Sequence, residues 1–267
     1  MKRLLCILVC SLFLFSFAAA DTLTIDTDVA TDEEINTLLE TLHAEKITRI
    51  KTRLANEVIE PDTDGLNLFR NIPWYSTREQ AEKILGVTSS SDWMSGLYRL
   101  SYIDYGNVST GADKVDGDLG CRPYYSGLSV AGYKPSDVYL CFVFPIVDGE
   151  IIRDNSVAQL YMGYYTFEKD DFGDLLIIYS DLETKLKALY GEGTYTETKY
   201  KNYRIWKDKV GNIIRLQVDN DGYYLTLGYV ANDADARIDA MAQAYLDEKT
   251  REEDLLRLEN TNNVDGL

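Results

Sequence analysis

Histidine and cysteine are scarce in this chain, which limits the chemistry that its side chains could carry out. His43 is the single histidine, and we expect it at a surface or boundary position of a helix. One histidine excludes a zinc site built from several histidines, and a Ser–His–Asp triad would need His43 itself as its base. A thiol dyad with Cys121 or Cys141 is left unconstrained by the sequence. The sequence therefore predicts no catalytic residue, no metal ligand and no cofactor, and favours a protein that is not an enzyme.

Acidic residues are abundant, and some of them gather in two loops. Several close carboxylates can bind a hard cation such as calcium, but neither loop has the spacing of a calcium loop with its closing glutamate. We expect solvated loop acids, with weak calcium binding as the alternative. Paired carboxylates could also serve a glycosidase, although an acidic chain offers many such pairs. The two groups are Asp113, Asp116 and Asp118, and Asp170, Asp171 and Asp174.

Two tryptophans flank the first helix of the predicted domain and are the candidate binding aromatics. Trp74 comes shortly before that helix and Trp93 shortly after it. Packing in the core, or as a lid on the helix–sheet interface, is one role for such side chains. An exposed aromatic platform for a ligand is the other.

The first twenty residues have the order of a secretory signal peptide. Lys2 and Arg3 precede an apolar run from Leu4 to Phe17, and three alanines end at Ala20 before Asp21. A charged start, an apolar core and a small-residue cleavage site are the three parts of such a signal. We predict export and cleavage after Ala20. A retained membrane anchor and a lipoprotein with lipid on Cys10 are the alternatives.

The formal net charge of −17 restricts the partners of the chain. Removal of residues 1–20 would remove Lys2, Arg3 and no acid, which takes the charge to −19. Such a chain repels nucleic acid phosphates and anionic lipid headgroups, so we expect neither as a partner. Solubility is the plain role of the charge, and binding of basic partners or divalent cations is the functional one.

Cys121 and Cys141 remain after the predicted cleavage and could form a disulfide. In an oxidising compartment two nearby thiols pair, and closing a loop of this length would contribute about 3 kcal/mol. Free thiols are the alternative, since exported proteins of anaerobes also contain them.

The apolar pattern predicts helices that alternate with groups of strands. Thr31 caps a helix that runs to about Asn56, and Glu34 is at the reciprocal capping-box position. Ser76 caps a second helix that ends at Gly86. Strands are expected over Gly96–Tyr105, Gly127–Tyr133, Asp137–Val147 and Ala158–Phe167, with a loop over Ser109–Pro123. A helix over Leu175–Tyr190, strands over Tyr203–Lys207, Ile213–Val218 and Tyr223–Val230, and a last helix from near Asn232 follow.

This order predicts an α+β fold of two-layer helix-on-antiparallel-sheet units, arranged in tandem and flanked by N- and C-terminal helices. We divide the chain into a signal peptide at 1–20, an N-terminal helix and linker at 21–66, a first helix-plus-sheet unit at 67–168, a second unit at 169–231, and a C-terminal helix with a frayed tail at 232–267.

One stretch, from Phe69 to Gly86, resembles a known motif. It is similar to the I-x-x-G-M-[ST]-x-x-x-V-x-x-x-L-G opening helix of small outer-membrane-assembly lipoproteins and of secreted beta-lactamase inhibitor proteins, which carry two helix-plus-sheet units in tandem. It also resembles exported proteins of gut Firmicutes with an Ile-Pro-Trp-Gly-Thr start. This chain has Tyr75 where the pattern has glycine. The resemblance implies a binding or scaffolding role and carries no catalytic residue.

We therefore expect a secreted, non-enzymatic protein that binds a protein or cell-envelope component through the exposed face of its sheets. The alternative is a carbohydrate-binding protein or glycoside hydrolase that uses clustered carboxylates and aromatics. A dimeric scaffold formed through the first and last helices is a third hypothesis. The sequence leaves the ligand and the oligomeric state open.

Overall fold

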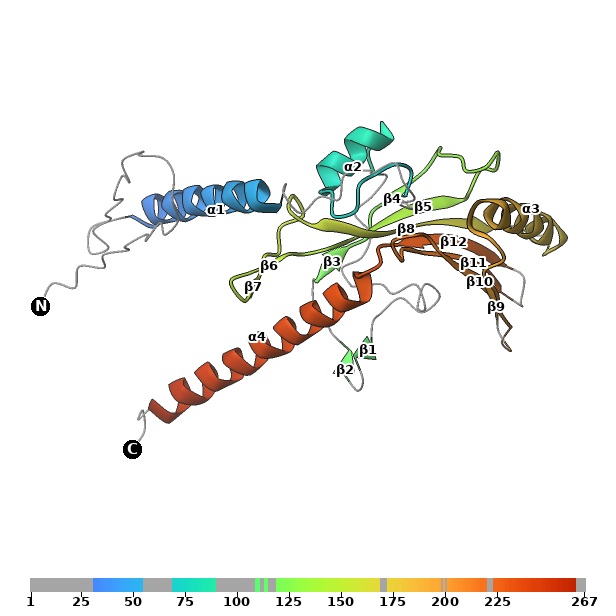
Figure 1. The fold of residues 1–267 in the computed structure, drawn as a ribbon. Coiled ribbons are helices and arrows are strands. Elements are labelled where there is room, and N and C mark those ends of the chain that lie inside the picture. Colours follow the sequence, from blue (N-terminus) through green and yellow to red (C-terminus); the bar gives the residue numbers. More distant parts are fainter. Residues whose placement is uncertain are drawn as a thin grey trace, which may run out of the picture. The chain divides into compact units, whose positions relative to one another are not determined.

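The computed structural model describes residues 31–54, 69–89, 109–110, 113–114, 119–168, 172–197, 199, 201–219 and 223–262 (Figure 1). Within these ranges it contains four helices and a mostly antiparallel sheet, so the predicted α+β class is confirmed. The predicted strand at Gly96–Tyr105 lies outside the described residues. None of the helices in these ranges is both long and apolar enough to span a bilayer.

The first helix, α1 (Asp32–Leu54), has the predicted start. The backbone N–H of Thr31 donates to Glu34 Oε2 at 2.9 Å, and the backbone N–H of Glu34 donates to Thr31 Oγ1 at 3.3 Å. This reciprocal pair satisfies two amide groups that the first turn of a helix leaves without partners. The hydrogen bonds from Thr31 lower the pKa of the Glu34 carboxyl. The capping box read from the sequence is therefore confirmed.

One eight-stranded sheet contains strands from both predicted units. Its order is β3–β5–β8–β12–β11–β10–β9, with β4 pairing to β5 beside β3. The strands are β3 (Gly120–Cys121), β4 (Tyr124–Tyr125), β5 (Asp137–Val143), β8 (Gln159–Glu168), β9 (Thr194–Glu197), β10 (Lys201–Lys207), β11 (Ile213–Asp219) and β12 (Tyr224–Val230). Because β8 pairs with β12 along its length, the two groups of strands form a continuous sheet, and a tandem of separate units is not confirmed.

Two further pairs of short strands lie outside this sheet. They are β1 (Ser109–Thr110) with β2 (Asp113–Lys114), and β6 (Ile146–Val147) with β7 (Glu150–Ile151). The stretch Ser109–Pro123, predicted as a loop, thus contributes β1, β2 and β3. The stretch Gly127–Tyr133, predicted as a strand, is a tight turn with one isolated bridge between Val130 and Tyr133. Ala131 and Gly132 have φ of 52° and 92° there, which a strand cannot accommodate.

The helices α2 (Arg78–Leu85) and α3 (Phe172–Tyr190) cover the same face of the sheet. Tyr125 Oη, on β4, donates to Glu82 Oε1 of α2 at 3.2 Å. Arg204 Nε, on β10, donates to Glu183 of α3 at 2.5 Å. Residues paired across strands lie on the same face of the sheet, and neighbours along a strand lie on opposite faces. The register therefore places one set of apolar side chains on the face covered by α2 and α3. They are Val138, Leu140, Tyr165, Phe167, Ile214, Leu216, Leu225 and Leu227, all buried with the α3 leucines.

The start of α2 differs by one residue from the sequence prediction. Thr77, not Ser76, is the N-cap, and it forms a capping box with Gln80. Ser76 is buried and its carbonyl accepts from the Leu160 N–H at 2.9 Å, so it belongs to the sheet edge. Gly86 ends the helix in the left-handed conformation, as predicted.

Tyr75 occupies the position where the motif has glycine, and its backbone adopts a glycine-like conformation with φ 67°. A non-glycine residue pays about 1 kcal/mol or more for this conformation. Burial offsets the cost, because the side chain is 2% exposed and the Arg237 guanidinium lies 3.6 Å from the ring centroid. The tight turn before α2 therefore forms without the glycine.

The ring of Phe69 packs directly against the backbone of the sheet at Gly163, which has no side chain. A Cβ atom at Gly163, on β8, would lie 2.4 Å from the ring of Phe69. Phe69 also lies 4.9 Å from the Tyr165 ring and 5.8 Å from the Tyr229 ring, between centroids. Only glycine at position 163 leaves room for this contact, which fixes the segment before α2 on the helix-covered face.

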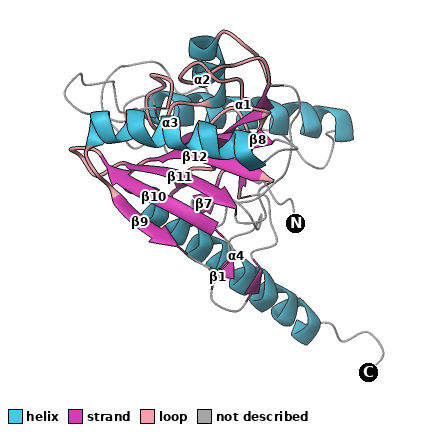
Figure 2. Cartoon of the chain, turned by 90° about the vertical axis from the view of Figure 1, so that its right-hand side faces the viewer, coloured by secondary structure: helices cyan, strands magenta, loops and turns pink. Residues whose placement is uncertain are grey.

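The last helix, α4 (Ala234–Asn262), starts directly after β12 and lies behind the sheet where α3 lies in front of it (Figure 2). The helix begins near Asn232, as predicted, and its residues Ile238 and Met241 are buried. The segment from Asp247 onward, predicted to fray, is helical to Asn262.

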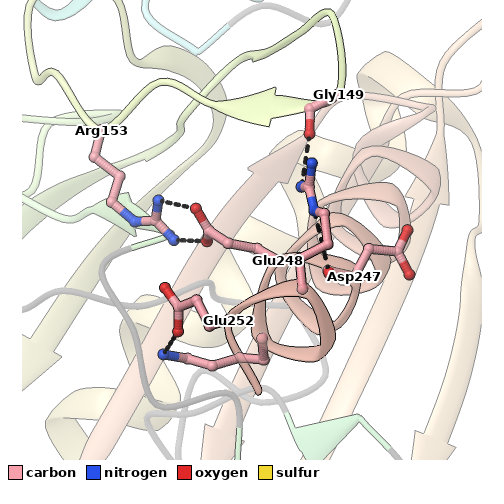
Figure 3. A network of polar contacts seen from close by, with 7 residues as sticks. Gly149, Arg153, Asp247, Glu248 and Glu252 are labelled. Atoms are coloured by element: carbon pink, nitrogen blue, oxygen red, sulfur yellow. Dashed lines mark hydrogen bonds and ion pairs between the residues drawn. The ribbon is translucent and has the colours of Figure 1, made fainter. Parts of the chain in front are cut away.

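Polar contacts attach the middle of α4 to the β6–β7 hairpin and the residues after it (Figure 3). Both terminal nitrogens of Arg153 donate to the carboxylate of Glu248, and Arg251 Nη2 donates to the carbonyl oxygen of Gly149 at 3.5 Å. The hydrogen bonds from Arg153 lower the pKa of Glu248, against a smaller opposing effect of burial. A bidentate guanidinium–carboxylate pair also fixes the orientation of the helix.

We predict that removing the hydroxyl groups of two buried tyrosines has different effects on the free energy of unfolding. Tyr125→Phe removes the hydrogen bond to Glu82 and should cost about 1–2 kcal/mol in the free energy of unfolding. Tyr75 Oη is buried and has no hydrogen-bond partner among the described residues. Tyr75→Phe should therefore change the free energy of unfolding by less than about 0.5 kcal/mol, or raise it. Urea denaturation measures both, and a larger loss for Tyr75→Phe would contradict the assignment.

We predict that the contribution of Glu248 depends on pH. Its pKa is lower in the folded state, so the stabilisation is present above the unfolded-state pKa and disappears as the pH falls through the folded-state pKa. Glu248→Gln should cost about 0.5–1 kcal/mol at neutral pH, because the pair is partly exposed, and nothing at strongly acidic pH. Urea midpoints at both pH values measure this. The matched variant Glu252→Gln, which loses an exposed pair with Lys249, should be nearly neutral throughout.

Candidate functional site

The sheet face opposite α2 and α3 is polar, and we call it the polar face. On β11 the side chains of Arg215, Gln217 and Asp219 alternate with Ile214, Leu216 and Val218, which lie on the helix-covered face. Because residues paired across strands lie on the same face, the polar side chains of the neighbouring strands continue this face. One row is Tyr124, Tyr139, Tyr164, Gly228 and Arg215, and the next is Asp137, Thr166, Thr226, Gln217 and Tyr203.

Tyrosine rings and an arginine are packed together at the β4–β5 end of the polar face. The rings of Tyr139 and Tyr164 are stacked, with centroids 4.8 Å apart and planes at 19°. The Arg122 guanidinium carbon lies 4.9 Å from the Tyr139 centroid, and Arg122 Nη1 donates to Tyr164 Oη at 2.5 Å. Tyr124 lies 6.2 Å from Tyr139. These contacts hold the side chains in place before any ligand arrives.

Burial differs along the polar face. Tyr164, Arg215, Gln217 and Thr226 are 2–6% exposed, whereas Arg122, Tyr124 and Tyr139 are half-buried. Burial raises the pKa of Tyr164 well above its ordinary value, and Arg122 acts in the opposite direction. The tyrosine hydroxyl is therefore neutral and serves as a hydrogen-bonding group. The accessible part of the polar face is its β4–β5 end, Arg122, Tyr124 and Tyr139, which we call the tyrosine–arginine end.

A second cation–π pair lies on the polar face near the other end of the sheet. The Arg215 guanidinium carbon is 4.2 Å from the Tyr203 ring centroid. Gly228 has no side chain and separates Arg215 from Tyr164 in their row. Since neighbouring strands are about 4.8 Å apart, these two side chains stand about 10 Å apart across the glycine. Arg215 is 6% exposed, so this second pair lies within the packed part of the face, and the accessible cation–π position is that of Arg122.

The two cysteines lie beside the tyrosine–arginine end, and both are free thiols in the structure. Cys121 pairs with Phe142, the neighbour of Cys141 on β5, and the register shift between Cys141 and Phe142 skips Tyr161 of β8. Because neighbours on β5 point to opposite faces, Cys121 and Cys141 lie on adjacent strands without sharing a face. Their pairing as a disulfide stays a prediction.

Of the two candidate aromatics read from the sequence, Trp74 is not part of this face. Trp74 is fully buried in the hydrophobic core, which corresponds to the packing role of the two considered for it. Trp93 lies outside the described residues. His43 is exposed on α1. Arg122, Tyr139, Tyr164 and Arg215 were missed, although the alternation Arg215, Gln217, Asp219 on β11 was a readable signal of a polar face.

Within the described ranges, no three His, Cys, Asp or Glu side chains are grouped so that they could hold a metal ion; Asp116, Asp118, Asp170 and Asp171 lie outside those ranges. No protein-family model matches the chain, and no curated protein or solved structure is significantly similar to it. The geometry of the polar face is therefore the observation that bears on function.

We predict that the two thiols react at very different rates. Burial raises the pKa of the Cys141 thiol, so almost no thiolate is present near pH 8, and the sulfur is inaccessible. Iodoacetamide should alkylate Cys121 in the folded protein and Cys141 only after unfolding, as read by peptide mass spectrometry. Intact mass with and without reductant tests the disulfide separately, because a disulfide removes two hydrogens. Rapid alkylation of Cys141 in the folded state would contradict the described burial.

Proposed function

We propose that this is an exported, non-enzymatic protein that binds a protein or cell-envelope component through the polar face. The observation that carries the proposal is the preorganised cluster at the tyrosine–arginine end. Tyrosine and arginine side chains dominate the binding energy of protein interfaces. Those of Arg122 and Tyr139 are already fixed by stacking and hydrogen bonding, so little side-chain entropy would be lost on binding.

The division of the sheet into two faces also supports the proposal. Helices α2 and α3 pack against the apolar face of the sheet, and the core between them and the sheet does not use the polar side chains of the other face. Hydrogen-bonding side chains that continue across five strands are costly to bury without partners. A binding surface is a physical reason for a sequence to maintain them. The resemblance of Phe69–Gly86 to beta-lactamase inhibitor proteins points to the same class of function.

The carbohydrate alternative receives less support from the same residues. A sugar ring binds a tyrosine through a free aromatic face. The ring of Tyr139 is stacked on that of Tyr164 on the next strand, and the Arg122 guanidinium carbon lies 4.9 Å from the Tyr139 centroid. Its ring faces are therefore used within the protein, which favours a partner that contacts the edges and hydroxyl groups of this cluster.

Capture followed by affinity measurement tests the proposal. The purified exported protein is used to capture partners from extracellular and envelope fractions, and each captured protein is then purified and titrated. Tyr124→Ala and Arg122→Ala should each weaken the affinity of a true partner about tenfold or more. The matched control is Tyr223→Ala, since Tyr223 is 62% exposed and lies at the β11–β12 end of the sheet. A partner that tolerates both polar-face substitutions would overturn the assigned surface.

A further inference from the structure

Two carboxylates are neighbours on the polar face, next to the tyrosine–arginine end. Asp137 pairs with Thr166, and Glu168 follows Thr166 by two residues on β8, so both acids lie on the same face of the sheet. Diagonal neighbours of this kind on paired antiparallel strands are about 7–8 Å apart. One positively charged group between Asp137 and Glu168 could therefore contact both carboxylates.

Backbone hydrogen bonds hold the two strands in this register up to the acids. The Ser136 N–H donates to the carbonyl oxygen of Thr166 at 2.8 Å, and the Glu168 N–H donates to Ser136 Oγ at 3.0 Å. Glu168 is exposed and Asp137 is half-buried. A partner would thus meet two accessible carboxylates on a backbone that the sheet has already fixed.

The charges of these two acids are not neutralised by basic side chains in the described part of the chain. Neither Asp137 nor Glu168 forms an ion pair with a described residue. Burial raises the pKa of the Tyr139 hydroxyl, Asp137 and Glu168 raise it further, and Arg122 acts in the opposite direction. The negative potential of both acids therefore reaches the hydroxyl group of Tyr139.

Arg122 lies at the same end of the polar face and would repel a cation. Its guanidinium carbon lies 4.9 Å from the Tyr139 centroid, and its Nη1 donates to Tyr164 Oη. This one arginine, which these contacts hold in place, is outnumbered by two carboxylates that have no described ion pair, in a chain of formal charge −17. The balance of charge favours a basic partner over an acidic one.

We propose that the protein bound by the polar face presents a lysine or arginine side chain to Asp137 and Glu168. The charged end of that side chain lies between the two carboxylates. Its methylene groups lie along the ring of Tyr124, which is opposite Tyr139 on β4 and diagonal to Asp137. The inference rests on the proposed function and adds the chemistry of the partner, a protein with an exposed basic segment.

The first test uses the isotope-labelled exported protein and the peptide acetyl-Gly-Lys-Gly-Lys-Gly-amide as a probe. The backbone amide signals in NMR spectra should shift saturably, most strongly at Asp137, Tyr139 and Glu168, and the shifts should decrease as salt screens the charges. The same peptide with both lysines acetylated has lost its side-chain charge and should cause shifts about fivefold smaller or less. No saturable shift, shifts spread evenly over the acidic surface, or equal shifts with the acetylated peptide would overturn the inference.

Variants that lose charge locate the contact. Asp137→Asn with Glu168→Gln should weaken binding of the lysine peptide about tenfold or more, because both carboxylates that contact the cation are lost. The matched control, Glu40→Gln with Glu253→Gln, removes the same charge at exposed positions of α1 and α4 and should change the affinity less than about twofold. Urea midpoints verify that both variants fold like the parent protein. An equal loss of affinity in the two variants would contradict a specific contact.

The captured partner separates this inference from the proposed function. A partner that Tyr124→Ala or Arg122→Ala weakens, but that tolerates Asp137→Asn with Glu168→Gln, would keep the polar face as the binding surface and overturn the basic contact. A partner that tolerates every one of these substitutions, while the lysine peptide still binds at Asp137, would count against the proposed function alone. Loss of affinity with the paired carboxylate substitutions is the result that we expect.

Discussion

The pairing of β8 with β12 is the constraint on which the rest of the structure depends. Every residue of β12 pairs with β8, and β8 is buried over most of its ten residues, between β5 and β12. This ladder joins the strands that precede α3 to the strands that follow it. As a result α2 and α3 lie on one face, and the polar side chains of both groups of strands form one surface on the other.

Local signals in the sequence were sufficient for most of the elements. The capping residues Thr31 and Gly86, the helix over Leu175–Tyr190 and the strands over Ile213–Val218 and Tyr223–Val230 were predicted from short-range patterns, and the structure contains the corresponding elements. Capping and turn chemistry act within a few residues, so they can be read without knowledge of the fold. The shift of the α2 cap from Ser76 to Thr77 shows the limit, because a tertiary contact of Ser76 decides it.

The candidate site could not be predicted in the same way. Tyr124, Tyr139, Tyr164 and Arg215 come from four strands and meet only through the register of those strands. Register depends on long-range pairing, and a shift by one residue would send each side chain to the opposite face. The register shift beside Cys141 is a further example, since it skips Tyr161 of β8 with no signal in the sequence. The prediction of two tandem units likewise could not account for the pairing of β8 with β12, which joins them.

The contact of the Phe69 ring with Gly163 limits when this part of the core can fold. Phe69 contacts Tyr165 and Tyr229, which are about 100 and 160 residues farther along the chain. When a polypeptide crosses a membrane or leaves a ribosome with its N-terminus first, Phe69 emerges long before the strands against which it packs. This part of the core can close only after β12 has emerged, so the early segment must stay unassembled during passage.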